Sequence, residues 1–331
     1  LVVLLLCAAG LQAQPVKLII DTDFGPDCDD AGALAVAHYL MNTGEAEIIG
    51  VVTTTYGHPI VPAIDVVNRY YGRPDIPVGH IGSDGVKIGS DWTRHLRDNF
   101  SYEKTDRNVP HSTQLYRRLV HESEEKVRIV VIGFQTALSA FLDSDADHEG
   151  DGIPYSGREL AQQKVEKLIL MAGDFDNPEK FEWNVKNDVA SAQNIAKNWP
   201  GEIIYTGYEI GKPIHSGGAL TDPDNNPVAM AYKMSHRTMP RPGSGTISDN
   251  HSWDLVAVFE AIRGNYHDGE RFWKLSDYGT VIIDKDSSPH TSLNVHPDGK
   301  HRYHIEDTKP EEKWELFDMM ITSGDGGGSE R

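Results

Sequence analysis

The feature of this sequence that most limits its fold is the alternation of short apolar runs with helix-like stretches along most of the chain. The apolar runs occupy residues 16–20, 46–55, 127–133, 165–173 and 201–207. The helix-like stretches between them occupy residues 29–42, 59–72, 136–144 and 188–199. Continuous apolar runs of this length are typical of strands buried on both faces of a parallel sheet, and helical crossovers join such strands. The sequence therefore predicts a doubly wound α/β fold, with a mainly parallel sheet and helices on both of its faces.

The last third of the chain is less regular, but three further elements are predicted in it. Residues 252–262 and 311–322 have the pattern of helices, and residues 278–284 have the pattern of a strand. No linker-like stretch divides the chain, so we expect a single domain over residues 14–323. The Gly-rich end, residues 324–331, is predicted to be a disordered tail.

The first 13 residues, LVVLLLCAAGLQA, have the apolar run and the small-residue end of a secretory signal peptide. We expect cleavage after Ala13, a signal that lacks its start, and a mature protein that is secreted or periplasmic. The run is too short to span a bilayer as a helix. A buried N-terminal strand is the alternative, and it is disfavoured because Gln14-Pro15 separates this run from the next one.

The sequence has two cysteines, Cys7 in the predicted signal and Cys28. Lipid anchoring through Cys7 is disfavoured, since Leu6 stands where such a signal needs a small residue. Removal of the signal leaves Cys28 alone, so no intrachain disulfide is expected. The neighbouring carboxylates disfavour its thiolate, and we expect a buried structural cysteine rather than a nucleophile.

The chain is acidic, with a formal net charge of −19 at pH 7. Binding to nucleic acid requires clustered Lys and Arg side chains, which neutralise the phosphates. An anionic membrane surface attracts the same basic residues. We therefore expect that neither nucleic acid nor, for the mature protein, a membrane is a partner.

The segment IIDTDFGPDCDD, residues 19–30, holds several aspartates directly after the first predicted strand. They are Asp21, Asp23, Asp27, Asp29 and Asp30. Ligands bind at the carboxyl ends of strands in open α/β sheets, and Gly25-Pro26 marks a tight turn that draws these side chains together. The amides of a helix N-terminus offset only about 0.3–1 kcal/mol for each exposed charge. A divalent cation with oxygen ligands is therefore the expected partner, and Ca²⁺ suits such a set best.

Several alternative roles for the aspartates fit the sequence less well. Aspartate-nucleophile phosphatases place Thr or Val two residues after the second Asp of their motif, where this chain has Gly25. The sequence contains no phosphate-cradling loop with Lys, no Gly-x-Ser-x-Gly elbow and no Cys/His set spaced for zinc. A capped helix with solvated aspartates is the structural alternative. A second acidic stretch, residues 143–152, lacks the Gly and Glu positions of a helix–loop–helix calcium loop, so a solvated loop is expected there.

Separated blocks of the sequence resemble the nucleoside hydrolase family of the inosine–uridine-preferring type. IIDTDFGPDCDDAGAL resembles the family's Asp-x-Asp signature, and VVTTTYGH (51–58) resembles the block after its second strand. VIGFQTALSAFL (131–142) and EWNVKNDVASAQNI (182–195) resemble its Gly-x-x-Thr and Glu-x-Asn blocks. SWDLVAVFEAI (252–262) resembles its last helix with an Asp. The blocks cover most of the chain in the family's order, and the family's fold agrees with the α/β fold expected above.

The resemblance implies a catalytic Ca²⁺ and hydrolysis of the N-glycosidic bond of ribonucleosides, or of a related N-riboside, with release of base and ribose. It implies that the side chains of Asp23, Asp30 and Asp254 hold the metal together with the main-chain carbonyl of Thr136. Asp23 would also be the general base for a calcium-bound water. Carboxylates around the sugar suit this reaction, because cleavage builds a ribosyl cation of oxocarbenium character.

The resemblance also implies a set of substrate-binding residues. They comprise Asp29, His58, Asn177, Glu182, Asn184 and Trp253. Asp29, Glu182 and Asn184 would bind ribose hydroxyls, which need charged acceptors and amides, and Asn177 would lie near the 5′-hydroxyl. Helix capping is the alternative role for Asp188 and, with less weight, for Glu182.

Some positions depart from the family pattern. The signature turn is two residues longer than in the best-known members, so Asp21 and Asp27 are further candidate ligands. His58 stands where those members carry an Asn that contacts ribose, and Trp253 where several carry a His that helps the base to leave. A Trp can stack on a purine but is no useful proton donor, so His251 is considered as a substitute.

The expected partner is a small-molecule nucleoside or riboside. Members of the family often form dimers or tetramers, so a homo-oligomer of this chain is a further expectation. The alternative function is a non-catalytic, calcium-stabilised protein that binds a ribosyl group or another sugar, since His58 and Trp253 replace family residues that contact substrate. The enzyme is favoured, because a site that keeps both metal ligands and a base is typical of catalysis.

Overall fold

The computed structural model of the protein describes residues 14–235, 247–306 and 310–323. The predicted signal peptide, residues 1–13, and the predicted tail, residues 324–331, lie outside this part of the chain. Within it, no helix combines the length and the apolar composition that crossing a membrane requires.

The core of the fold is one large sheet whose central strands are parallel. In spatial order these strands are β4 (Val78–Gly79), β2 (Ala46–Thr53), β1 (Val16–Thr22), β6 (Val127–Val131), β7 (Val165–Leu170), β8 (Ile203–Tyr205) and β16 (His301–Glu306). Antiparallel pairs at the β16 end add β13 (Trp273–Leu275), β14 (Gly279–Ile283) and β15 (Thr291–Val295). Buried apolar residues face one another across the ladder, as Ile20 does with Val51 and Val130.

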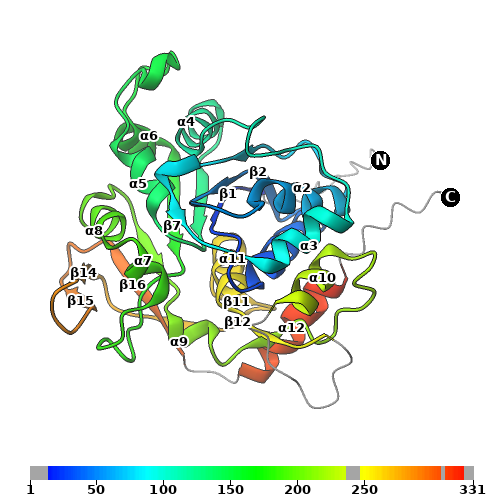
Figure 1. Cartoon of the computed structure of the whole chain (residues 1–331). Helices are drawn as coiled ribbons and strands as arrows, with labels where there is room; N and C mark the ends of the chain where they lie inside the picture. Colours follow the sequence, from blue (N-terminus) through cyan, green and yellow to red (C-terminus); the bar gives the residue numbers. More distant parts are fainter. Residues whose placement is uncertain (1–13, 236–246, 307–309, 324–331) are drawn as a thin grey trace, which may run out of the picture.

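Helices cover both faces of this sheet, as Figure 1 shows. One layer consists of α1 (Asp29–Asn42), α2 (Ile60–Tyr70), α10 (Pro227–Met234), α11 (Trp253–Arg263) and α12 (Pro310–Thr322). The other consists of α4 (Ser112–Glu122), α5 (Thr136–Asp143), α6 (Gly157–Lys164) and α8 (Val189–Asn198). Each layer encloses its own apolar cluster, with Ile20 in the first and Ile19 in the second, since successive side chains of a strand point to opposite faces. The predicted doubly wound fold is confirmed.

The remaining elements are short. They comprise α3 (Asp91–Asn99), α7 (Trp183–Asn187), α9 (Tyr208–Gly211), the 3₁₀ turns Gly82–Asp84 and His148–Gly150, and the strands β3 (Thr55–Tyr56), β5 (Val86–Lys87), β9 (His215–Ser216), β10 (Asn250–His251), β11 (Tyr266–His267) and β12 (Glu270–Arg271). β3 pairs with β5, β9 with β10 and β11 with β12, outside the main sheet. α3 packs against α2 and α10.

The strand order creates a topological switch point between β1 and β6. The chain runs outward from β1 through β2 to β4 and then returns to β6 on the other side of β1. Crevices for ligands form at such a point, outside the carboxyl ends of the two strands. Gly133 follows β6 here, and a Cβ atom on it would lie 2.5 Å from the backbone N of Asp23. Glycine therefore allows the segment after β6 to lie directly beside the segment after β1.

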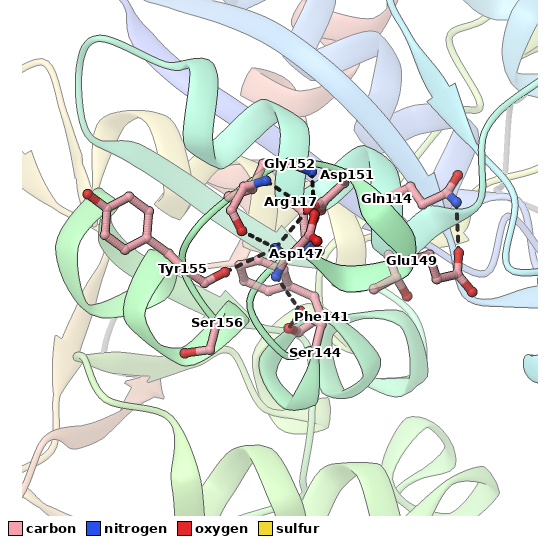
Figure 2. Close-up of polar contacts among 12 residues, drawn as sticks. Gln114, Arg117, Phe141, Ser144, Asp147, Glu149, Asp151, Gly152, Tyr155 and Ser156 are labelled. Atoms are coloured by element: carbon pink, nitrogen blue, oxygen red, sulfur yellow. Dashed lines mark hydrogen bonds and ion pairs between the residues drawn. The ribbon is translucent and has the colours of Figure 1, made fainter.

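The second acidic stretch, residues 143–152, is anchored by a buried arginine (Figure 2). Arg117 of α4 is fully buried, and its guanidinium donates to both carboxylate oxygens of Asp151, at 2.5 Å and 3.3 Å. It also donates to Ser144 Oγ and to two backbone carbonyls beyond the stretch. The hydrogen bond from Arg117 holds the pKa of the Asp151 carboxyl below its ordinary value. The expected solvated loop is therefore tied to the body of the protein at its end.

We expect Arg117→Ala to lower the free energy of unfolding by about 3 kcal/mol, because it leaves a carboxylate and several buried acceptors without their donor. Urea unfolding of the variant and the wild type measures the difference. Arg118→Ala, on the exposed side of the same helix, is the matched control and should cost less than about 0.5 kcal/mol. Equal losses in the two variants would contradict this role of Arg117.

A buried histidine makes the stability of the protein depend on pH. His38 of α1 is fully buried, and its Nδ1 lies 3.4 Å from Arg73 Nη1, a group that can only donate. Its Nε2 therefore carries the hydrogen and donates to Asn68 Oδ1 at 2.9 Å. Burial lowers the pKa of His38 to about 3, from an ordinary value of 6.5. Between these two values the unfolded chain binds one more proton than the folded chain, so acidification across this window costs stability.

His38→Gln should reduce this loss, because its amide keeps a donor at the Nε2 position but does not titrate. Relative to wild type, we expect the variant to gain up to about 1.4 kcal/mol for each pH unit below the ordinary histidine pKa. Urea unfolding of both proteins in steps from about pH 7 to pH 4 measures this difference. A constant difference across that range would show that His38 does not contribute to the acid sensitivity.

Candidate active site

A pocket of about 230 Å³ lies at the carboxyl ends of the central strands. It is lined by Asp23, Asp27, Asp29, Ile132, Met171, Glu182, Trp183, Asn184, Tyr208, Trp253 and Asp254. Asp23 follows β1, Ile132 follows β6 and Met171 follows β7, so the pocket occupies the switch point of the sheet. Most of the site residues predicted from the sequence line it, namely Asp23, Asp29, Glu182, Asn184, Trp253 and Asp254.

Asp30 is buried in the first turn of α1, where three donors fix its carboxylate. Thr22 Oγ1 donates to Oδ1 at 2.5 Å. The backbone amides of Phe24 and Gly25 donate to Oδ1 and Oδ2, at 3.1 Å and 3.0 Å. Gly25 has a φ of +138°, which favours glycine, and this conformation turns its amide toward the carboxylate. The turn between β1 and α1 is thus folded around Asp30.

Asp29 connects two parts of the acidic cluster. Its Oδ2 accepts a hydrogen bond from the backbone amide of Asp254, in the first turn of α11, at 3.1 Å. Carboxylate oxygens of Asp27, Asp29 and Asp30 lie within 4.8 Å of one another. Aspartates from the first strand-to-helix turn and from α11, 225 positions further along the chain, therefore converge on one place.

These carboxylates raise one another's pKa. Burial raises the pKa of Asp23, Asp29 and Asp254 well above the ordinary range, and the charges of neighbouring aspartates raise it further. At Asp30, burial and the charge of Asp27 outweigh the three donors and raise the pKa to about 7. A cation among these groups would offset the repulsion and favour the ionised carboxylates.

Glu182 and Asn184 are fixed at the start of α7. Glu182 is the N-cap of this helix, because its Oε1 and Oε2 accept from the backbone amides of Asn184 and Val185 at 2.8 Å and 3.0 Å. Oε2 also accepts from the Gly173 amide at 3.2 Å, yet burial raises the pKa of Glu182 to about 7. Asn184 Nδ2 donates to the carbonyl of Met171 at 3.0 Å, so Oδ1 is the polar atom left for a ligand hydroxyl. Capping and pocket lining are thus combined in Glu182.

Three further predicted site residues, Asp30, Thr136 and Asn177, do not line the pocket. Thr136 begins α5, and its Oγ1 donates to Asp188 at 2.6 Å. Asp188 is the N-cap of α8, where its Oδ1 accepts from the Ser191 amide at 3.1 Å. The backbone amide of Asn177 donates to Asp174 Oδ1 at 2.7 Å. Contacts of Thr136 with a metal and of Asn177 with a 5′-hydroxyl stay predictions.

His58 and Asp21 also lie outside the pocket lining. His58 is 5% exposed, and its two ring nitrogens face the hydroxyls of Thr55 and Thr93. Burial lowers its pKa to about 4, so the ring is neutral near pH 7. Asp21 accepts a hydrogen bond from the Tyr116 hydroxyl of α4 at 2.7 Å. The structure thus places both side chains among other parts of the protein, and a ribose contact of His58 stays a prediction.

Aromatic rings also line the pocket. The Trp253 ring stacks on Tyr208, with centroids 5.3 Å apart and an interplanar angle of 25°, and its Nε1 donates to the Tyr208 carbonyl at 2.8 Å. These two contacts fix the plane of the indole. Trp183, which is 44% exposed, completes the set. Of these rings only Trp253 was predicted from the sequence; Trp183 directly follows Glu182, which could have drawn attention to it, whereas no sequence signal points to Tyr208.

The sequence matches, over residues 18–303, a family described as inosine–uridine preferring nucleoside hydrolase. The chain belongs to this family. The resemblance carried by the separated sequence blocks is thereby confirmed, and the protein is a member of a family of N-glycosyl hydrolases. Among curated proteins no sequence match is found.

Solved structures share the nucleoside hydrolase fold with this chain. The plant nucleoside hydrolase PpNRh1 is 20% identical, with a TM-score of 0.64 over 93% of this chain and 99% of its own. The inosine–uridine preferring nucleoside hydrolase from Bacillus anthracis is 15% identical, with a TM-score of 0.65 over 93% and 99%. The type III effector protein XopQ, solved with adenosine diphosphate ribose, is 14% identical, with a TM-score of 0.65 over 95% of each chain. At sequence identities of 14–20%, the similarity to these structures establishes only the fold of this chain.

In this nucleoside hydrolase, His251 is poorly suited to protonate a leaving base. Its ring packs on Trp253 with centroids 4.5 Å apart, and its Nδ1 donates to the Lys212 carbonyl at 2.5 Å. A neutral imidazole has a single N–H, so Nε2 carries no hydrogen to donate. Burial lowers the pKa of His251 below its ordinary value, which keeps the ring neutral. We therefore do not assign the role of proton donor to His251.

Proposed function

We propose that this nucleoside hydrolase cleaves the N-glycosidic bond of ribonucleosides, or of a related N-riboside, in a reaction that depends on Ca²⁺. The observation that carries the proposal is the convergence of Asp23, Asp29, Glu182, Asn184 and Asp254 on one pocket. A ribose presents hydroxyl donors, and its C1′ becomes positive as the bond to the base breaks. Carboxylates and an amide oxygen match both of these properties.

The residues at this site fit a calcium ion. The candidate ligands are oxygen atoms, most of them on buried carboxylates whose pKa is raised, and a divalent cation would remove the repulsion behind those shifts. The side chains of Asp23, Asp30 and Asp254 and the main-chain carbonyl of Thr136 would hold the ion. Asp27 is an alternative ligand, because one of its oxygens lies within 4.8 Å of an oxygen of Asp30.

The chain's own residues would divide the chemistry among them. When bound, the cation would supply the positive charge that acidifies a neighbouring water. Asp23 would take a proton from the attacking water while the water oxygen bonds to C1′ and the bond between C1′ and the base nitrogen breaks. Asp29, Glu182 and Asn184 would hold the ribose hydroxyls, and the two carboxylates would stabilise the ribosyl cation. Trp253 would stack on the base.

The test is to incubate the protein with inosine, adenosine, guanosine, uridine and cytidine at saturating calcium, and to measure free base and free ribose by chromatography. We expect base and ribose in equal amounts from at least one ribonucleoside. If calorimetry shows binding of ribonucleosides and chromatography shows no release, the protein is instead the non-catalytic sugar-binding protein, and the proposed reaction is wrong.

A further inference from the structure

His58 lies at the centre of a chain of hydrogen-bonding groups that ends on the backbone of Asp23. Thr55 Oγ1 donates to the Asp23 carbonyl at 2.9 Å and lies 3.4 Å from His58 Nε2. On the other side of the ring, Nδ1 lies 3.2 Å from Thr93 Oγ1, which donates to the Ser90 carbonyl at 3.0 Å. The chain therefore connects the segment after β1 with the first turn of α3.

The side chains of this connection are buried. Thr55 and Thr93 are 0% exposed and His58 is 5% exposed. A buried polar group that loses its partner cannot form a hydrogen bond with bulk water instead. Each of these three side chains therefore restrains the position of its neighbour. The position of the Asp23 backbone thus depends on side chains that do not themselves line the pocket.

The number of available N–H and O–H hydrogens limits the hydrogen bonds that His58 can make. Each threonine hydroxyl has one proton, and each gives it to a carbonyl, so lone pairs face the ring from both sides. A neutral imidazole has one N–H and can donate to only one of the two hydroxyls. The single N–H of His58 can therefore serve one acceptor at a time, and the Asp23 backbone is a hydrogen-bond partner of the ring beside Thr55. The ring also spans the space between Thr55 and Thr93.

We propose that His58 is a positioning residue for the hydrolysis. By holding Thr55 in place against α3, it fixes the backbone of Asp23 and so the direction of the Asp23 carboxylate. The inference rests on the proposed function, in which that carboxylate takes the proton of the attacking water. This role is an alternative to the ribose contact implied for this position, and it acts on the Asp23 backbone directly and through Thr55.

Two substitutions separate the two ends of the ring. The amide nitrogen of Asn is as many bonds from Cα as Nδ1 of His, so His58→Asn keeps the contact with Thr93 only. The amide of Gln reaches as far as Nε2, so His58→Gln keeps the contact with Thr55.

We expect His58→Asn to lower kcat by about ten- to hundredfold with KM changed less than about threefold, since a displaced base impairs chemistry more than binding. His58→Gln should recover most of this loss, and His95→Asn, elsewhere on α3, is the control that should change neither constant.

A double-mutant cycle with Thr55→Val tests whether His58 acts through Thr55. Thr55→Val removes the hydroxyl that contacts Asp23 and should lower kcat about as much as His58→Asn. Adding His58→Asn to Thr55→Val should then lower kcat by less than about threefold more, because the link is already broken. Full multiplication of the two losses, or equal kcat values for His58→Asn and wild type, would overturn the positioning role.

Calcium affinity, measured by calorimetry, gives a readout that does not depend on turnover. Because Asp23 is a proposed ligand, we expect His58→Asn to weaken calcium binding by about threefold or more, with the same lack of additivity toward Thr55→Val. A wild type that binds calcium but releases no ribose would contradict the proposed reaction and leave the positioning role to be decided by these affinities. A wild type without turnover and without calcium binding would overturn both.

Discussion

Asp23→Asn should lower kcat for ribonucleoside hydrolysis by about a thousandfold while the protein stays folded. The amide cannot take a proton from water, and it also removes one of the negative charges that would stabilise the ribosyl cation. The two side chains have nearly the same shape, so the packing around this buried position should not change. Initial rates of base release at saturating substrate and calcium measure the effect, and circular dichroism checks the fold.

The matched control for this substitution is Asp145→Asn, in the exposed part of the second acidic stretch. It changes the net charge of the protein by the same amount, so we expect kcat within about twofold of wild type if only the local charge at the pocket matters. An Asp23→Asn variant with the wild-type kcat would show that another group is the base. Asp27 and Asp29, which line the same pocket, would then be the residues to substitute next.

Removal of calcium should lower the melting temperature of the wild type by about 5 °C, if the ion is present at about a hundredfold excess over its Kd. The physical reason is that Asp23, Asp29, Asp30 and Asp254 are buried together, and burial and mutual repulsion disfavour their charged forms. A bound cation offsets this cost only in the folded protein. Scanning calorimetry in calcium, in chelator, and in chelator followed by excess calcium measures the shift and its reversal.

Asp23→Asn provides an internal comparison for this experiment. With one carboxylate fewer, the remaining carboxylates of the variant should repel one another less when the ion is absent. The ion should therefore stabilise the variant less, and removal of calcium should lower its melting temperature by less than that of the wild type. Identical melting curves of the wild type in calcium and in chelator would contradict a metal site at the acidic cluster.

The α/β part of the fold could be predicted from the sequence because its signals are local. Residues 29–42 were predicted as a helix and form α1 with these bounds, since residues 31–37 of the run are all small or apolar and are buried. The strands β1, β2, β6 and β7 coincide with the buried apolar runs. The order of these strands across the sheet could not be predicted from local signals. It depends on the side of β1 on which β6 pairs after the chain has formed β2 and β4.

The last third of the chain was harder to predict. The strand expected at 278–284 is β14, but β13, β15 and β16 were not predicted. β16 reads HRYHIE, with little of the apolar character of a buried strand, and it joins the parallel part of the sheet by pairing with β8. Polar segments of this kind become strands through their neighbours rather than through their own propensity.

In the candidate site, too, some residues could be predicted from local sequence signals and others could not. Asp23 and Asp29 could be predicted because carboxylates directly after a strand meet at one edge of the sheet, and Asp254 was implied by the resemblance of residues 252–262 to the last helix of the family. The positions of His58 and Asn177 could not be predicted, because the contacts of side chains in loops are often with segments that are remote in sequence. The contact between His58 and Thr93 is an example. The same holds for Tyr208, which enters the pocket beside Trp253.

The measurement that tests the central claim most directly is the rate of ribose release from the ribonucleoside panel as a function of buffered free calcium. The proposed function predicts a rate that rises with calcium to saturation, with a midpoint equal to the Kd from calorimetry, and a rate near zero in chelator. A rate that is the same in calcium and in chelator would contradict the calcium-dependent mechanism. No ribose release from any ribonucleoside at any calcium concentration would contradict the proposed reaction itself.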